Sequence, residues 1–307
     1  MGRYSRLRYI QTLDPERDYE EIFALTTRYE FPWDYNTGYS FAFVTDFVIP
    51  TVTHELASTG QFAHHSMKRY DDTMLFPFDA HRHGLESGEG RATIRKLNKI
   101  HSHYGISNQD YLHILAGHLV CAVDWINAYG WRPLCDNEVR ALVLTHRRLG
   151  QLMGIKDIPE TYEQFKRWID NDIEERGRWH YANSTMVGYV LGIIAGLCPP
   201  GTRALSTRAI VSLIDEPVRV MLDQPKMPAW FTAAVRWGLC SRGRALRFFP
   251  PRRRPYNRTP RSYPHGWSLE EMGPHYTRGG HHPAREPVGS PHRAPEQAGT
   301  SPRKAAR

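Results

Sequence analysis

The amino-acid sequence predicts an all-α fold, and three observations lead to this prediction. Apolar residues recur at spacings of three and four in one segment after another, as they do along one face of a helix. Residues that favour helix starts precede several of these segments, and glycine follows several of them. No segment of useful length alternates apolar and polar residues as a half-buried strand would.

In the first part of the chain, the pattern predicts a polar helix over residues 18–28. An apolar run follows from Thr37 to Gly60 and is interrupted by Pro50. Next comes a polar stretch that ends in HRHGLESGEG, residues 81–90, where three glycines indicate a loop. The remaining segments show clearer helical periodicity and caps, and we expect helices over residues 91–103, 109–129, 136–153, 161–176, 183–197, 206–222 and 230–247.

The composition is that of a folded chain with a distinct C-terminal end. Of the 307 residues, 40% are hydrophobic and 23% charged, which is enough apolar material for a large core. The formal net charge is +8, but residues 277–307 contribute six Lys or Arg against two Glu, so the body is closer to neutral. We therefore expect no nucleic-acid partner. We expect one domain over residues 1–276, with residues 250–276 as an ordered extension, and a disordered basic tail over 277–307.

The chain shows no signal-peptide pattern at its start. Its longest apolar stretch, residues 185–198, is short for a transmembrane helix and fits a buried core helix better. These features predict a cytoplasmic protein with at most peripheral membrane contact. The four cysteines are scattered and match neither a zinc site nor a disulfide framework.

His101 is the most informative single residue. It shares one predicted helix face with Ile94, Leu97 and Tyr104, at spacings of three and four. Such a histidine can be a core residue, a general base or a metal ligand, and a neutral imidazole in apolar surroundings is what a haem iron requires. No second histidine stands four residues away, and His113 and His118 are five apart, a spacing that does not favour a shared face.

Arg69 and Thr73 form a second candidate pair, because residues four apart lie side by side on a helix. A guanidinium group next to a hydroxyl group can bind an anion, a haem propionate or an oxygen species on a metal. The simpler interpretation is a surface arginine that forms a solvated pair with Asp71 and Asp72.

Five segments in order resemble the catalytic domain of the mpaB/rubber-oxygenase family. They are FVIPTVTHELASTGQF, KRYDDT, GRATIRKLNKIHSHYGISNQDYLHIL, WINAYGWRPL and SYPHGWSLEEMGP, and the similarity spans about residues 20–276. The resemblance implies a globin-like helical bundle around a buried pocket that holds haem b non-covalently. It also implies that His101 is the axial iron ligand and that Arg69 and Thr73 lie on the distal side.

A distal carboxylate serves as a base in rubber oxygenases, and Glu55 is the nearest candidate here. Family members often vary at the position before the threonine, and this chain has Asp72 there. The resemblance further implies dioxygen as a partner and oxidative cleavage of a C=C bond in an isoprenoid or other hydrophobic substrate, with an electron donor as an additional partner to consider. Two alternatives remain: a haem peroxidase or monooxygenase acting on a small hydrophobic metabolite, and a helical haem or ligand carrier without turnover.

Overall fold

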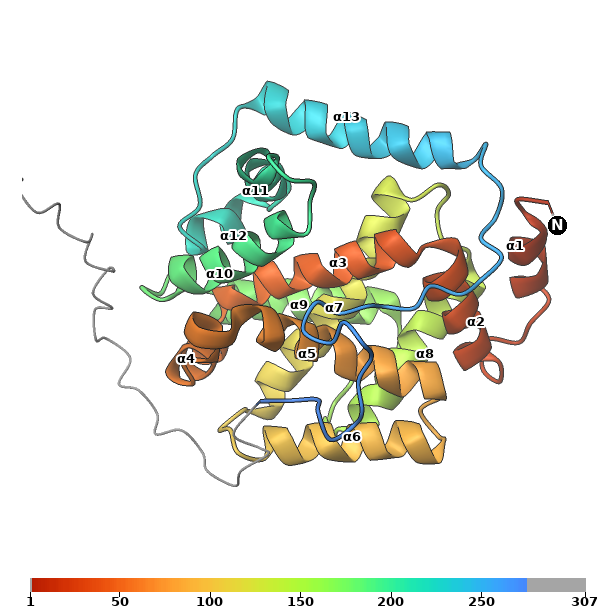
Figure 1. The fold of residues 1–307 in the computed structure, drawn as a ribbon, viewed down its shortest axis with the longest axis horizontal. Helices are drawn as coiled ribbons and strands as arrows, with labels where there is room; N and C mark the ends of the chain where they lie inside the picture. The colour runs from red at the N-terminus through yellow and green to blue at the C-terminus, as the bar shows by residue number, and fades with distance from the viewer. Residues whose placement is uncertain (1, 275–307) are drawn as a thin grey trace, which may run out of the picture.

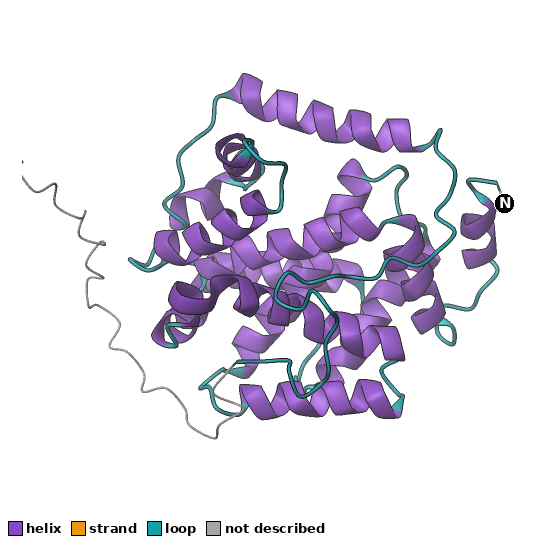
Figure 2. Cartoon of the chain, in the orientation of Figure 1, coloured by secondary structure: helices purple, strands orange, loops and turns teal. Residues whose placement is uncertain are grey.

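A computed structural model describes residues 2–274 of the chain. Every regular element in this range is a helix, and the described residues contain no strand (Figures 1 and 2). The prediction of an all-α fold is therefore confirmed. The predicted disordered tail, residues 277–307, lies outside the described residues.

The described chain forms thirteen α-helices, one π-helical turn and one 3-10 turn. In chain order the elements are α1 (Ser5–Ile10), α2 (Tyr19–Leu25), η1 (Thr26–Glu30, π), α3 (Pro32–Thr45), η2 (Asp46–Val48, 3-10), α4 (Pro50–Ser58), α5 (Gln61–His83), α6 (Gly88–His101), α7 (Asn108–Tyr129), α8 (Asp136–Leu152), α9 (Tyr162–Arg176), α10 (Asn183–Gly196), α11 (Arg203–Val211), α12 (Glu216–Met221) and α13 (Ala229–Leu246).

Most of the predicted helices occur within two or three residues of their expected ends, because local caps define them. The Ser107 side chain accepts a hydrogen bond from the backbone N–H of Asp110 and starts α7, and Thr161 caps α9 in the same way. One prediction was wrong in part. The loop expected over residues 81–90 is confined to residues 84–87, because the residues before it end α5 and Gly88 and Gly90 form the first turn of α6. The polar stretch before this loop is helical, with a kink at His65.

A second prediction needs correction because the segment 206–222 is two helices. Helix α11 ends at Val211, and α12 begins at Glu216 with a proline in its first turn. Proline is tolerated in the first turn of a helix but cannot continue the hydrogen bonding of a preceding one. Pro217 therefore starts a new helix, and the apolar periodicity alone did not show the break.

Helices α3 and α7 form the centre of the molecule and pack closely along their lengths. Gly38 of α3 makes this approach possible, since a Cβ atom there would lie 2.7 Å from the Cα atom of Ala122 and from the carbonyl oxygen of Cys121. Helix α7 is buried over most of its length, which matches its largely apolar sequence. One hydrophobic cluster joins α3 to α5 and α10, and another joins α7 to α8 and α9.

The C-terminal segment, residues 250–274, crosses back over the molecule without regular structure (Figure 1). The backbone N–H of Tyr256 donates to the carbonyl of Arg28, and the indole N–H of Trp267 donates to Asp79 of α5 at 2.9 Å. Met272 is buried against Ile100 in a small hydrophobic cluster. The predicted ordered extension is thus confirmed for the described residues, and it holds α5 and α6 together.

Candidate functional site

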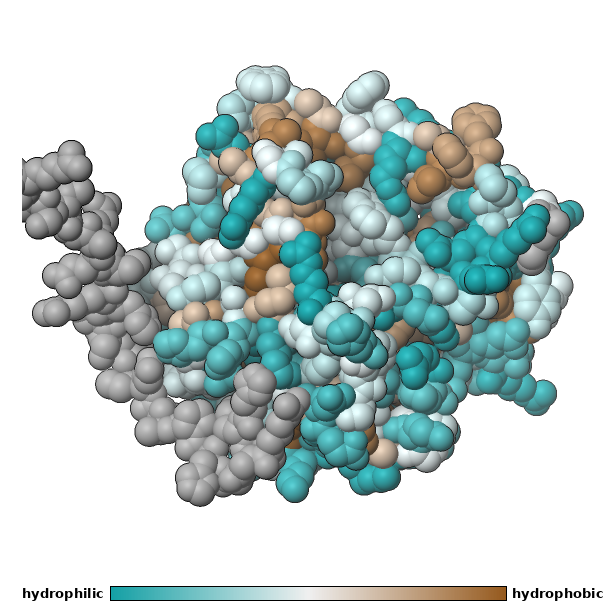
Figure 3. All heavy atoms as spheres, in the orientation of Figure 1, coloured by the Kyte–Doolittle hydropathy of each residue, from teal (hydrophilic) through white to brown (hydrophobic). Residues whose placement is uncertain are grey.

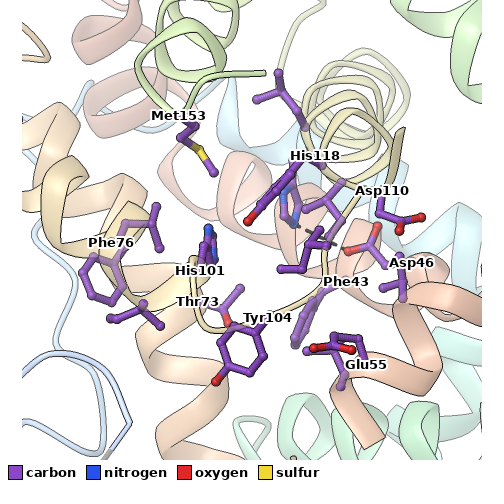
Figure 4. Close-up of a pocket in the computed structure, with 18 of the residues that line it drawn as sticks. Phe43, Asp46, Glu55, Thr73, Phe76, His101, Tyr104, Asp110, His118 and Met153 are labelled. Carbon is purple, nitrogen blue, oxygen red and sulfur yellow. Dashed lines mark ion pairs between the residues drawn. The ribbon is translucent and has the colours of Figure 1, made fainter. Parts of the chain in front are cut away.

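A cavity of about 590 Å³ lies between α3, α4, α5, α6 and α7, and Gly273 and Pro274 of the C-terminal segment also line it. Most of its surface is apolar, with side chains such as Phe43, Phe76 and Met153 in the wall (Figure 4). A few polar groups face the same space. This combination of apolar walls and a few convergent polar groups is typical of small-molecule and cofactor sites.

His101 stands at the C-terminal end of α6 and projects into this cavity (Figure 4). Its buried Nδ1 atom has no hydrogen-bond partner among the described residues. Burial, with a smaller contribution from the positive charge of Arg69, lowers the pKa of His101 to about 4. The imidazole is therefore neutral at ordinary pH and has a nitrogen lone pair to offer a metal or an acid. Across the described residues, no three His, Cys, Asp or Glu side chains converge, so His101 would be a single protein ligand.

Arg69 and Thr73 lie one turn apart on α5, and both line the same cavity as His101. The Arg69 guanidinium donates a hydrogen bond to the Thr73 hydroxyl, which itself donates to the backbone carbonyl of Arg69 at 2.9 Å. Burial lowers the pKa of Arg69 from its ordinary value. An arginine remains protonated nonetheless, so the cavity contains a largely desolvated positive charge close to His101.

The alternative of a solvated pair between Arg69 and its neighbours is wrong, because Asp71 and Asp72 are buried and have other partners. Asp72 forms an ion pair with Lys68 at 3.0 Å and accepts a hydrogen bond from the Tyr263 hydroxyl. Asp71 accepts from the backbone N–H of Ser262 at 2.8 Å. Both aspartates therefore connect α5 to the C-terminal segment, whereas the Arg69 side chain lines the cavity.

Glu55 also reaches the cavity, from α4 (Figure 4). Its Oε1 atom accepts a hydrogen bond of 3.2 Å from the backbone N–H of Gly105, in the turn that follows α6. The structure thus brings all four predicted site residues, Glu55, Arg69, Thr73 and His101, to one cavity. Their chemical roles stay predictions.

Sequence reasoning missed a second polar group in this cavity, formed by Asp46 and His118. Asp46 is almost fully buried, and neither of its carboxyl oxygens has a hydrogen-bond partner among the described residues. The Nε2 atom of His118 lies 4.0 Å from one of them, a contact drawn as a dashed line in Figure 4. Burial raises the pKa of Asp46 well above its usual value and lowers that of His118 to about 3, so burial disfavours the charged form of both groups and His118 is neutral at ordinary pH.

His113 approaches the other oxygen of Asp46, also at 4.0 Å, so one carboxyl group lies between two histidines of α7. The two histidines thus face a common group, which a spacing of five did not predict. The ring of Tyr39 stacks on His118, with centroids 3.9 Å apart. A sequence signal did exist: Asp46 is the lone charged residue in the apolar run from Tyr39 to Val52, and a charged residue expected in a core needs an explanation.

Comparison with known proteins shows the family. The family model of the ER-bound oxygenase mpaB/B'/rubber oxygenase catalytic domain matches residues 37–249. The chain belongs to this family. The matched range includes the cavity residues of α3 to α7, whereas the fifth resembling segment, SYPHGWSLEEMGP, lies beyond it.

Among curated relatives, the chain is 32% identical over 196 residues to the ER-bound oxygenase mpaB of Penicillium roqueforti, covering 58% of this chain and 65% of that protein. It is 30% identical over 165 residues to ER-bound oxygenase mpaB of Penicillium brevicompactum, covering 49% of this chain and 42% of that protein. The chain therefore spans less than two thirds of the length of these mpaB/rubber-oxygenase relatives. Within residues 2–274, no helix is both long and apolar enough to cross a membrane.

Proposed function

We propose that this member of the oxygenase family is a haem b-dependent enzyme that cleaves a C=C bond of an isoprenoid or other hydrophobic substrate with dioxygen. The observation that carries the proposal is the neutral His101 imidazole, with an unpartnered Nδ1 atom, in an apolar cavity that also contains Arg69 and Thr73. Family membership supplies the reaction class, oxygenation.

The residues present fit a haem group. A cavity of about 590 Å³ falls within the range of cofactor sites, and a buried neutral histidine at its wall is the donor that haem iron takes. His101 would hold the iron, and bound haem would supply the activation of dioxygen. A globin-like arrangement of the surrounding helices stays a prediction of the resemblance.

The other cavity residues have roles that follow from their surroundings. The desolvated guanidinium of Arg69 favours negative charge on any group that faces it, because charge interactions strengthen where water is excluded. The hydrogen bond to Thr73 fixes the orientation of that guanidinium. Glu55 is a carboxylate at the cavity wall that can accept an allylic proton from an alkene. The apolar wall binds the hydrophobic substrate.

The proposal also covers the substrates, an electron donor and the location of the protein in the cell. Dioxygen and a hydrophobic small molecule or polyisoprenoid are the proposed substrates, with an electron donor as a further partner to test. We propose a cytoplasmic location with peripheral membrane contact at most, while noting that the named relatives are ER-bound.

The test is the visible absorption spectrum of the purified chain with a pyridine haemochrome assay. A Soret band with about one haem b per chain is expected, since His101 is the one histidine proposed as axial ligand. His101→Ala should abolish haem uptake. His118→Ala is the matched control, because it removes a second neutral histidine from the same cavity wall and should leave haem bound. Equal haem content in the two variants would refute the ligand assignment.

The same preparations separate the enzyme from the alternatives. Arg69→Ala should retain haem but lose at least tenfold in turnover of an alkene substrate, because the charge that favours anionic species in the cavity is removed. Products with two carbonyl groups would support cleavage, and hydroxylated or peroxidised products would support the monooxygenase or peroxidase alternative. A haem-loaded chain that turns over none of these substrates would support the carrier.

A further inference from the structure

Helix α13 lies at the edge of the molecule, outside the layers formed by the other helices (Figure 1). Gly243 is its one buried residue, and a Cβ atom there would lie 2.6 Å from the carbonyl oxygen of Tyr129, so α13 contacts the end of α7 closely at this point. Arg242 anchors the helix through an ion pair of 2.7 Å with Asp34 of α3, and Arg247 donates to the carbonyl of Trp131 at 2.7 Å. The helix is therefore held firmly along one side, and the opposite side faces outward.

The outward side of α13 and the turn after it carry large aromatic residues. Trp230 is 72% exposed, Trp237 70%, Phe248 90% and Phe249 61%. Trp230 and Trp237 are seven residues apart, so they lie on one face two turns apart. Hydrophobic residues gather along the edge of the molecule over α13 in Figure 3. Exposed apolar side chains gathered in one region mark an interaction surface more often than isolated ones do.

The same region is strongly basic. Residues 224–269 contain nine Arg and one Lys but no Asp or Glu. Arg236 and Arg244 of α13 are exposed and form no ion pair within the described part of the chain, and Arg244 lies seven residues after Trp237, on the same face. The acidic group that does contact α13, Asp34, is already paired with Arg242.

We propose that α13 and the turn that follows it, residues 229–254, form a docking surface for an anionic lipid bilayer. Tryptophan and phenylalanine side chains favour the boundary between headgroups and acyl chains, and arginines beside them pair with anionic headgroups. A second copy of the chain fits less well, because two surfaces of the same positive sign would repel each other. A DNA duplex fits less well too, because its phosphates would pair with the arginines but it offers no apolar surface to the exposed aromatic side chains. The proposal is independent of the oxygenase reaction.

The test is co-sedimentation of the full chain with phosphatidylcholine vesicles that contain phosphatidylserine at about one lipid in three. Binding is expected, with much weaker binding to vesicles of phosphatidylcholine alone and a decrease as salt is added. Trp230→Ser combined with Trp237→Ser should weaken binding by roughly tenfold or more. Arg236→Gln combined with Arg244→Gln should weaken it by roughly fivefold per arginine. Trp179→Ser removes an equally accessible tryptophan, 62% exposed, outside this surface and should bind like the unaltered chain.

Thermal unfolding of each variant checks that the fold is intact, which is expected because the altered side chains are exposed. The proposal is overturned if both double variants bind vesicles as tightly as the unaltered chain. It is also overturned if the vesicles are not bound while a DNA duplex is, or if the tryptophan variant changes only the oligomeric state in size-exclusion chromatography. None of these readouts depends on haem or turnover, so failure here leaves the proposed reaction untouched.

Discussion

Buried polar groups around the cavity fall into two chemical classes. His113, Asp172 and Arg176 satisfy one another, with His113 Nδ1 2.7 Å from Asp172 and the Arg176 guanidinium bonded to the same carboxylate. Within residues 2–274, His101, His118 and Asp46 each retain a buried atom without a hydrogen-bond partner. Buried polar groups are normally satisfied, so the first class serves the architecture and the second is available to a bound molecule.

Asp172→Asn should destabilise the chain by about 3 kcal/mol at neutral pH, because it removes the charge that partners Arg176 and His113. Burial alone would raise the pKa of Asp172, but hydrogen bonds from His113 and Arg176 overcome it and hold the pKa well below its usual value. The stabilisation by Asp172 is therefore complete above about pH 4 and is lost as the pH falls toward the folded-state pKa. Urea unfolding at several pH values measures both effects.

The control for this prediction is Asp124→Asn, which breaks the half-exposed ion pair with Lys166. Exposed pairs contribute about 1 kcal/mol or less, so this variant should change little at any pH. A loss for Asp172→Asn no larger than that of the control would show that the buried network does not stabilise the fold.

At the scale of the element, the close packing of α3 against α7 brings Asp46, in the turn after α3, next to His118 of α7. Gly38→Ala should cost about 1–3 kcal/mol of unfolding free energy, because the added methyl group overlaps backbone atoms of Ala122 and Cys121 that cannot move independently. Thermal or urea denaturation measures the loss. Gly188→Ala, in the exposed face of α10 with no atom within 4 Å of the new methyl group, should be neutral or stabilising. Equal stability of the two variants would contradict the close contact.

The sequence predicted helices well where caps and apolar periodicity agreed, as at Ser107 and Thr161, and failed where they conflicted. Helix α5 is rich in polar residues, and three of them, Asp71, Asp72 and Asp79, accept hydrogen bonds from the distant C-terminal segment. Such partners, about 190 residues away in sequence, leave no local signal.

For the site too, residues close together in the sequence could be predicted, whereas contacts between distant segments could not. Helical spacing singled out His101 and placed Arg69 next to Thr73, and the family resemblance added Glu55 and the expected role of His101 as iron ligand. Asp46 and His118 were missed because their proximity depends on how α7 packs against the 3-10 turn after α3. The residue pattern along α7 does not show which residues of another element will contact it, because that contact depends on how the two elements pack in the folded chain.

At the scale of the whole molecule, residues 250–274 close one side of the structure. Truncation after Phe249 should lower the melting temperature by several degrees, because it exposes the apolar side chains under Tyr263 and Met272 and removes the hydrogen bonds that Ser262 and Trp267 donate to Asp71 and Asp79. Differential scanning fluorimetry measures the change. Truncation after Tyr276 is the control, because it keeps every contact described for this segment. Equal melting of the two truncations would show that the segment adds nothing to stability.

The position of Gly273 and Pro274 in the cavity wall has a consequence for biosynthesis. A ribosome makes the chain from its N-terminus, so α5 and α6 emerge long before the segment that completes the wall beside them. The cavity therefore stays open on that side until nearly all of the described chain has been released. If the proposed haem enters during this interval, it meets a partly built enclosure, and we expect docking of residues 250–274 to slow its escape.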